Sequence, residues 1–381
     1  MIQRFIKKIV EKKLFKGKVV IIYGPRQSGK TTLVKSIIHD FENNNKQKKV
    51  RYYSCDDKVV REALVYEDYD SLQKSIGNYD LVILDEAQRI ENIGLKLKLL
   101  VDNNTSMQII ATGSASFDLA NKIKEPLTGR FYEFELLPFS VLEVVGKAFG
   151  DIDMKKEFDR SSIYGLYPDI YNRSFEESKE LLNSLSSSYL YKDILELEHI
   201  KKSESLEKIV TMLALQLGNE VNLNEVARVV KLNIRTVEKY INLLEKAYVI
   251  FRLRAYTKNE RNEVSRNFKV YFYDLGIRNS IIKNFSNLEN RSDTGGIFEN
   301  WCILERLKNY YNQGDVGMRK YFWRDYQKRE IDYLEERDGA LYAFEFKYTK
   351  ERSKNYTKLQ EITGVQNIKI INKENLSDLF T

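Results

Sequence analysis

Short apolar runs separated by polar and glycine-containing segments mark the first part of the chain. Residues 19–22 are apolar and precede a glycine-rich segment, after which residues 33–38 can form a helix. Residues 49–54, 79–85 and 107–111 are expected to form the next three strands. Residues 79–85 are mostly apolar, as a parallel strand covered on both faces should be. This order predicts an α/β fold, a doubly wound parallel sheet with its ligand at the carboxyl ends of the strands.

The middle of the chain is helical in its periodicity. Residues 146–205 are charged and show few chemical signals, and residues 206–217 form an amphipathic pattern. Asn224 is expected to cap a helix over residues 225–230. A second helix over 234–245 and strands at 248–252 and 270–274 complete the pattern of a winged helix, in which helix, turn, helix and β-hairpin follow one another.

Six polar or basic side chains of this segment are candidates for contact with DNA. Three lie on the exposed side of the second helix and three in the loop between the strands, namely Arg235, Thr236 and Lys239, and Lys258, Arg261 and Arg266. The alternative is a winged helix that only packs against other parts of the protein or binds a protein partner.

The glycine-rich segment after residues 19–22 has the spacing of a phosphate-binding loop, G-x-x-x-x-G-K-T, from Gly24 to Thr31. Glycines let the backbone turn its N–H groups toward phosphate oxygens, and the following helix presents its positive end to the same anion. Lys30 is expected to reach the β- and γ-phosphates, and Thr31 to ligate Mg²⁺. The nucleotide-binding residues expected from this motif are Gly24, Pro25, Arg26, Gln27, Ser28, Gly29, Lys30, Thr31 and Thr32.

Further polar residues follow the ends of the later strands. Asp85, at the end of a buried strand, is expected to hold Mg²⁺ together with Thr31, and Glu86 to orient or deprotonate the attacking water. Thr112 and Ser114 are both candidates to sense the γ-phosphate or the water, and the sequence does not choose between them. Arg130 could act in trans as an arginine finger, or be an ordinary surface arginine.

The C-terminal part carries a second set of acidic residues. Alternation places Glu330 and Asp332 on one face of a strand, and Glu345 and Lys347 on one face of its hairpin partner. Asp332 and Glu345 could bind Mg²⁺, while Lys347 orients water or stabilises the charge of the phosphorane. With Glu299 on the preceding helix, this set resembles that of PD-(D/E)xK nucleases. The alternative is a surface hairpin with salt bridges.

Several motifs together resemble a family of archaeal and bacterial predicted AAA+ ATPases that carry a C-terminal domain of unknown function. They are G-P-R-Q-S-G-K-T-T, L-D-E-A-Q, A-T-G-S-A-S, L-T-G-R, L-P-F-S-V-L-E, G-L-Y-P-D-I-Y, Y-F-Y-D-L-G-I-R and G-I-F-E-N. The resemblance spans nearly the whole chain and implies ATP binding and hydrolysis. It implies little about the substrate, and the second-sensor arginine of other AAA+ proteins has no clear counterpart.

Length and composition bound these expectations. A chain of 381 residues predicts two to three domains. We expect an ATPase domain at 1–145, a helical linker or lid at 146–205, a winged helix at 206–280 and a nuclease-like α/β domain, similar to restriction endonucleases, at 281–381. The net charge of +7 permits an anionic partner such as DNA without requiring one.

The few cysteines and histidines exclude some classes of protein. Cys55 and Cys302 lie far apart and the chain has only two histidines, so neither a zinc site nor a disulfide framework is expected. These features and the lack of long apolar runs favour a cytoplasmic protein that does not enter the membrane. The function expected is an Mg²⁺-dependent ATPase coupled to a nuclease-like region acting on DNA. The alternative is a nucleotide-dependent switch or scaffold that binds a protein partner, and a homo-oligomer is compatible with both.

Overall fold

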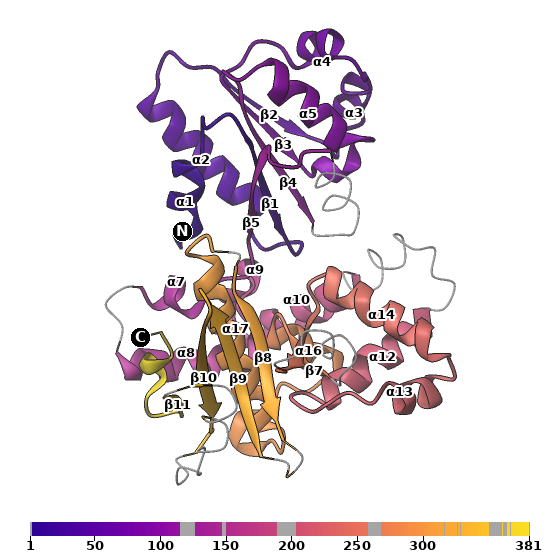
Figure 1. The fold of residues 1–381 in the computed structure, drawn as a ribbon, viewed down its shortest axis with the longest axis vertical. Helices are drawn as coiled ribbons and strands as arrows, with labels where there is room; N and C mark the ends of the chain where they lie inside the picture. The colour runs from indigo at the N-terminus through magenta and orange to yellow at the C-terminus, as the bar shows by residue number, and fades with distance from the viewer. Residues whose placement is uncertain are drawn as a thin grey trace. The chain divides into compact units, whose positions relative to one another are not determined.

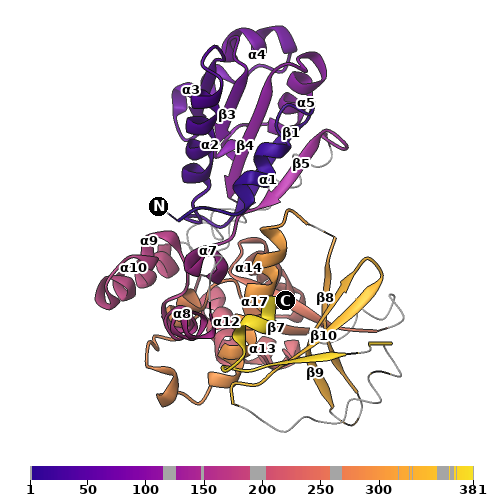
Figure 2. The ribbon, with the colours of Figure 1, turned by 90° about the vertical axis from the view of Figure 1, so that its left-hand side faces the viewer.

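A computed structural model describes the chain in two compact units (Figures 1 and 2). The first unit comprises residues 1–138 with 311–314, and the second comprises residues 139–310 with 315–381. The residues described are 2–114, 126–146, 150–188, 203–257, 268–315, 317–325, 327, 329–349, 360, 364–365, 367–380. Among them, no helix combines the length and the apolar character needed to cross a bilayer.

The described strands of the first unit form one parallel sheet in the order β2-β3-β4-β1-β5. The strands are β1 (Val19–Gly24), β2 (Val50–Ser54), β3 (Leu81–Asp85), β4 (Gln108–Ser114) and β5 (Phe131–Glu135). The expected α/β fold with a parallel sheet is confirmed. The strand after the phosphate-binding loop and helix is β2 at the edge, so the chain crosses over before it returns to the centre with β3 and β4.

Helices cover both faces of this sheet because β1 and β3 are apolar on both sides. Helices α1 (Ile6–Lys12) and α2 (Lys30–Asn44) pack against the face that carries Val20 and Ile22. The other face, which carries Ile21 and Leu84, is covered by α4 (Tyr69–Ile76) and α5 (Ile93–Asn103), while α3 (Lys58–Ala63) is short and mostly exposed. Because all five strands are parallel, their carboxyl ends meet at one edge of the sheet, where the phosphate-binding loop lies.

The second unit begins with helices and continues into a mixed sheet. Its helices are α7 (Val141–Val145), α8 (Asp151–Tyr164), α9 (Pro168–Tyr171), α10 (Phe175–Ser188), α12 (Ser203–Leu215), α13 (Leu223–Val230), α14 (Ile234–Lys246), α16 (Leu275–Ile281) and α17 (Thr294–Tyr311). Its strands are β6 (Ile250–Ala255), β7 (Phe268–Phe272), β8 (Arg319–Arg324), β9 (Glu330–Arg337), β10 (Ala340–Phe346) and β11 (Ile368–Ile371). Short 3-10 turns lie at Ala87–Arg89, Leu288–Asn290 and Leu376–Phe380.

The expected succession of helix, turn, helix and hairpin is present as α12, α13, α14, β6 and β7. One detail differs: the cap of α13 is Asn222, whose side chain accepts bonds from the backbone N–H groups of Asn224 and Glu225 at 3.0 and 3.2 Å. The expectation that Asn224 caps this helix is therefore wrong. Both asparagines flank Leu223, and the helix starts there, two residues earlier than expected.

Strands β6 and β7 belong to the same sheet as the C-terminal strands, in the order β11-β10-β9-β8-β6-β7. An expected domain boundary between residues 280 and 281 therefore falls inside one compact unit. Helix α17 also joins the two parts, because the Asn300 side chain accepts from the backbone N–H of Phe272 at 2.7 Å and donates to its carbonyl at 2.9 Å. These two bonds satisfy Phe272 on the outer edge of β7, where the backbone N–H groups of Gly218 and Val221 donate to Val270 and Phe268.

Candidate functional site

The phosphate-binding loop joins β1 to α2 and has the backbone geometry that its glycines predict. A Cβ atom at Gly24 would lie 2.1 Å from the carbonyl oxygen of Leu136, so only glycine fits there. Gly29 has φ of 95° and precedes α2, and Gln27 has φ of 58°. Two left-handed residues in a loop before a helix N-terminus produce a cradle of backbone N–H groups that suits a phosphate.

Two side chains of the loop fit an anion. The Lys30 ammonium is buried and donates to the carbonyl oxygens of Gly24 and Pro25 at 3.0 and 2.8 Å, so it lies within the loop. The Ser28 hydroxyl is buried and has no hydrogen-bond partner among the described residues. Of the other predicted residues, Pro25 is buried, Arg26 and Thr31 are half-buried, and Gln27 and Thr32 are exposed.

Three hydroxyl groups converge on the Asp85 carboxylate, which is 4% exposed at the end of β3. Thr31 and Tyr52 donate to its Oδ2 atom at 2.7 and 2.5 Å, and Thr112 donates to its Oδ1 atom. Burial, followed by the bond to Asp85, raises the pKa of Tyr52, so its phenol remains a donor at neutral pH. Thr31 and Asp85 are brought together as the sequence predicted, and their oxygen atoms are the ligand type that Mg²⁺ prefers. Tyr52 was not predicted.

Glu86 lies directly after Asp85, in the left-handed region with φ of 56°. Its backbone N–H donates to the Thr112 hydroxyl at 3.2 Å. The Gln88 side-chain amide donates to a carboxylate oxygen of Glu86 and to the Ser114 hydroxyl at 3.1 Å. Thr112 thus bonds directly to Asp85, whereas Ser114 is linked to Glu86 through the Gln88 amide. Gln88 was missed as a functional residue, although it stands in the L-D-E-A-Q motif two positions after Glu86.

Arg130 precedes β5 and lies away from the loop of its own chain. Its carbonyl accepts from the N–H of Val19, which places it at the amino ends of the strands, whereas the loop follows the carboxyl end of β1. The Arg130 Nε atom lies 2.6 Å from a carboxylate oxygen of Asp102.

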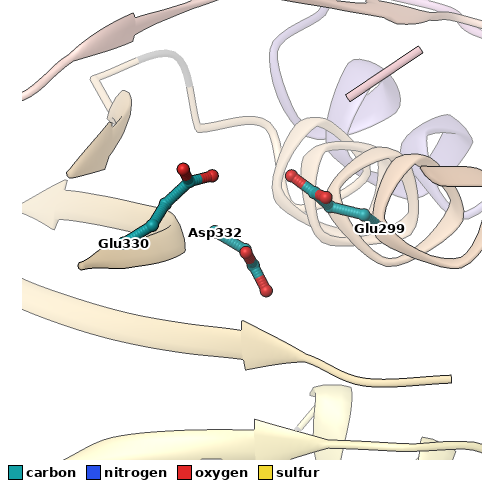
Figure 3. Close-up of side chains that lie close together, drawn as sticks. All are labelled: Glu299, Glu330 and Asp332. Atoms are coloured by element: carbon teal, nitrogen blue, oxygen red, sulfur yellow. The ribbon is translucent and has the colours of Figure 1, made fainter. Parts of the chain in front are cut away.

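In the second unit, three carboxylates approach one another between α17 and β9 (Figure 3). They are Glu299, Glu330 and Asp332, whose oxygen atoms lie within 4.8 Å of one another. Burial, then the negative charges of Glu299 and Glu345, raise the pKa of Asp332 well above its ordinary range. Among the described residues this is a group that could hold a cation, and it contains two of the predicted acids.

Lys269 of β7 enters this group, which the sequence did not suggest. Its ammonium lies 2.9 Å from Glu299 and also pairs with Glu330. Burial opposes its charge, but these carboxylates outweigh that effect and raise the pKa of Lys269. The Tyr271 hydroxyl donates to the same oxygen of Glu299. Glu299 is therefore held by two side chains of strand β7.

The E-x-K pair lies beside this group. The Lys347 ammonium is 2.8 Å from a Glu345 oxygen and 4.0 Å from an Asp332 oxygen, and the N–H of Phe346 donates to Asp332 at 2.7 Å. Glu345 is buried and is not one of the three grouped carboxylates. The structure thus brings Asp332, Glu345 and Lys347 together as expected, and Glu299 and Glu330 also lie close to Asp332.

The candidates for DNA contact are only partly described. On α14, Arg235 and Lys239 are exposed, whereas Thr236 is half-buried and its hydroxyl donates to the capping side chain of Asn233 at 2.9 Å. Thr236 therefore stabilises the start of the helix. Lys258, Arg261 and Arg266 lie outside the described residues.

Comparison with protein families divides the chain into three matched segments. Residues 16–145 match the model of an AAA domain. Residues 155–288 and 294–376 match two domains of unknown function, DUF8612 and DUF4143. The expected combination of an AAA domain with a C-terminal domain of unknown function is confirmed.

The similar proteins come from bacteria and archaea. An uncharacterised protein of Mycobacterium tuberculosis is 28% identical over 343 residues, covering 89% of this chain and 72% of that protein. One of Methanocaldococcus jannaschii is 25% identical over 393 residues, covering 96% and 84%. One of Haemophilus influenzae is 24% identical over 366 residues, covering 90% and 86%.

Two solved structures give a distant likeness. AMPPCP-bound DnaA from Aquifex aeolicus is 18% identical with a TM-score of 0.30, covering 63% of this chain and 86% of that chain. Pif1 helicase from Candida albicans is 15% identical with a TM-score of 0.29, covering 49% and 48%. Scores of this size carry no argument about function. Support for nucleotide binding comes instead from the match of residues 16–145 to an AAA domain and from the geometry of the phosphate-binding loop.

Proposed function

We propose that the first unit is an Mg²⁺-dependent ATP hydrolase. The observation that carries this proposal is the Asp85 carboxylate, buried at the carboxyl end of β3 and hydrogen-bonded to Thr31 of the phosphate-binding loop at 2.7 Å. A threonine hydroxyl and an aspartate carboxylate so placed are oxygen ligands that would hold a Mg²⁺ ion beside the phosphate-binding loop. The unpartnered Ser28 hydroxyl and the Gly24 cradle suit the phosphates themselves.

Each residue then has a separate role. Lys30 would exchange its bonds to the loop carbonyls for bonds to the β- and γ-phosphates. Thr31 and Asp85 would hold Mg²⁺, which when bound neutralises charge on the phosphate oxygens. Glu86 would orient the attacking water and accept its proton.

Two substitutions separate binding from hydrolysis. Lys30→Ala should abolish tight binding of Mg·ATP, because the phosphates lose their charged ligand. Glu86→Gln should retain binding and lower turnover by about 100-fold or more, because an amide cannot accept the proton. Lys46→Ala, at an exposed lysine of the same unit, is the control and should change neither. Wild-type turnover in Glu86→Gln would mean that the residue that activates the water lies elsewhere.

A second activity is favoured by the acidic group of the other unit: a metal-dependent nuclease-like site that acts on DNA. Asp332, Glu345 and Lys347 lie close together, and a carboxylate oxygen of Glu299 lies within 4.8 Å of one of Asp332. Asp332 and Glu345 would hold the metal ion, which supplies charge stabilisation when bound, and Lys347 would orient the water. Exposed Arg235 and Lys239 of α14, in a winged helix, would contact the DNA backbone.

Metal binding can be tested without interference from the nucleotide site. In the Lys30→Ala protein without nucleotide, Mn²⁺ should raise the melting temperature, and Asp332→Asn with Glu345→Gln should erase that rise. The same protein with the acidic residues intact should nick or cut linear, single-stranded or branched DNA in Mn²⁺. Stabilisation by Mn²⁺ without cleavage would leave a metal-binding module. No effect of Mn²⁺ would leave these residues as a salt-bridge network.

The coupling of the two units separates action on DNA from the alternative, a nucleotide-dependent switch that binds a protein partner. If the protein acts on DNA, added DNA should stimulate ATP hydrolysis, and Arg235→Ala with Lys239→Ala should weaken that stimulation. Hydrolysis that is unchanged by any form of DNA would favour the switch.

A further inference from the structure

The Gln88 side chain links two groups that the sequence proposed for separate roles. Its amide nitrogen donates to a carboxylate oxygen of Glu86 and to the Ser114 hydroxyl at 3.1 Å. The orientation of the amide follows from charge: the nitrogen must face the Glu86 carboxylate, because the amide oxygen there would place two acceptors in contact. The Gln88 oxygen is buried and has no partner among the described residues. The orientation of the Gln88 amide is thus set by the two bonds of its nitrogen, to Glu86 and to Ser114.

Ser114 stands where it can report on the nucleotide. It is the last residue of β4 and pairs in register with Gly24, the first residue of the phosphate-binding loop. A hydroxyl can accept from Gln88 and at the same time donate to a phosphate oxygen. The Ser114 hydroxyl can therefore connect a γ-phosphate bound at the loop with the Gln88 amide.

The Glu86 side chain is half-buried and projects from a backbone in the left-handed region, with φ of 56°. Its carboxylate needs a hydrogen-bond partner to stay in one place. A carboxylate that activates a water must lie within hydrogen-bond reach of that water, and small misplacements cost rate. Among the described residues, the Gln88 amide is the one side chain that donates a hydrogen bond to the Glu86 carboxylate.

We propose that Gln88 is a positioning residue that sets the place of the Glu86 carboxylate relative to the γ-phosphate contacted by Ser114. The chain of bonds runs from phosphate to the Ser114 hydroxyl, then to the Gln88 amide and the Glu86 carboxylate. This inference rests on the proposed ATP hydrolysis. It assigns to Gln88 an effect on turnover and no part in binding.

The first test separates binding from turnover. Gln88→Ala should bind ATP with an affinity within about threefold of wild type and turn it over about 10- to 100-fold more slowly, the effect of losing one hydrogen bond to a charged group. Unchanged turnover, or loss of ATP binding together with turnover, would overturn the proposal. If wild-type protein has no turnover, or Lys30→Ala does not impair binding, the proposed ATPase itself fails, and that outcome is visible before Gln88 is tested.

The second test has a readout that a purely structural role would not move. Gln88→Glu replaces the donor of this chain of bonds by an acceptor, so kcat for ATP hydrolysis should fall while the KM for ATP stays within about threefold of wild type. The matched control is Gln73→Glu, another half-buried glutamine of this unit, whose side chain bonds to Gly77 and Asn104, and it should leave kcat unchanged. An unchanged kcat in Gln88→Glu, or an equal fall in the control, would overturn the proposal.

Discussion

The Lys269 ammonium lies 2.9 Å from a carboxylate oxygen of Glu299, and the two side chains come from strand β7 and helix α17. Lys269 also pairs with Glu330 of β9, and only 4% of its side chain is exposed. One lysine thus neutralises two of the three grouped carboxylates. Because β7 follows the helices α12–α14, this ion pair joins the helical segment of the second unit to its C-terminal strands.

Replacing this lysine should be costly for stability. Lys269→Met leaves the half-buried Glu299 without its cation and Glu330 with only the Arg324 guanidinium, 3.5 Å away, so the free energy of unfolding should fall by about 3–5 kcal/mol, the cost of breaking a largely buried pair. Urea unfolding measures the change. The control is Lys208→Met, which breaks the exposed pair with Glu204, 57% and 78% exposed, and should cost less than about 1 kcal/mol. Equal effects of the two substitutions would show that Lys269 does not stabilise the fold as a buried pair.

The phosphate-binding loop and Asp85 could be predicted because each belongs to a local sequence pattern, whereas the contacts of Lys269 could not. The loop from Gly24 to Thr31 is one continuous motif, and Asp85 ends an apolar run, so both can be located without knowing the fold. Lys269 contacts Glu299, thirty residues later, because α17 lies beside β7, and it contacts Glu330 because β7 and β9 belong to one sheet. A lysine in an apolar strand shows no local pattern from which its partners can be inferred.

Two of the other differences also depend on contacts between segments that are far apart in the sequence. Tyr52 looks like an ordinary strand tyrosine, and its bond to Asp85 depends on β2 pairing with β3 in a register that aligns Tyr52 with Ile83. Gln88 did carry a signal, because an amide two residues after a proposed active-site carboxylate lies within reach of it. The boundary expected at residue 280 was based on changes of pattern along the chain, which do not show that β6 pairs with β8.

Tyr52 should affect the requirement for Mg²⁺. Tyr52→Phe removes the donor that lies 2.5 Å from the Asp85 oxygen, so the carboxylate is less well oriented toward the ion. The Mg²⁺ concentration for half-maximal ATP hydrolysis should rise about tenfold. Tyr53→Phe is the control on the same strand, since the Tyr53 hydroxyl donates to the carbonyl of Ile76. If Tyr52→Phe needs no more Mg²⁺ than this control, Tyr52 does not orient Asp85 for the ion.

The stability of the second unit should fall as pH rises from about 4.5 to about 7. Burial raises the pKa of Glu157 to about 7 from 4.5, against the lowering effects of Arg160 and Tyr171. Between these values the folded chain keeps a proton that the unfolded chain has released, so its contribution is complete below 4.5 and is lost as pH passes 7. The size of this contribution is about 3 kcal/mol.

Glu157→Gln isolates that contribution because the amide does not titrate. The difference in the free energy of unfolding between pH 5 and pH 7.5 should be smaller in this variant than in wild type. Glu177→Gln, at an exposed glutamate, is the control and should leave the difference near its wild-type value. The same pH dependence in Glu157→Gln and wild type would mean that Glu157 ionises normally in the folded chain.

Arg130 can contribute to hydrolysis only on a neighbouring molecule, because it precedes β5 at the edge of the sheet opposite to its own phosphate-binding loop. Arg130→Ala should therefore bind ATP normally and hydrolyse it slowly. Mixing it with Glu86→Gln protein should restore part of the turnover, since a neighbour with intact Arg130 would then serve an intact Glu86.

Asp102→Ala is the matched control: it breaks the Arg130–Asp102 pair, 41% and 38% exposed, but leaves the guanidinium in place, so turnover should persist. Wild-type turnover in Arg130→Ala would make Arg130 a surface arginine. Equally slow turnover in Asp102→Ala would assign the effect to the ion pair within the chain.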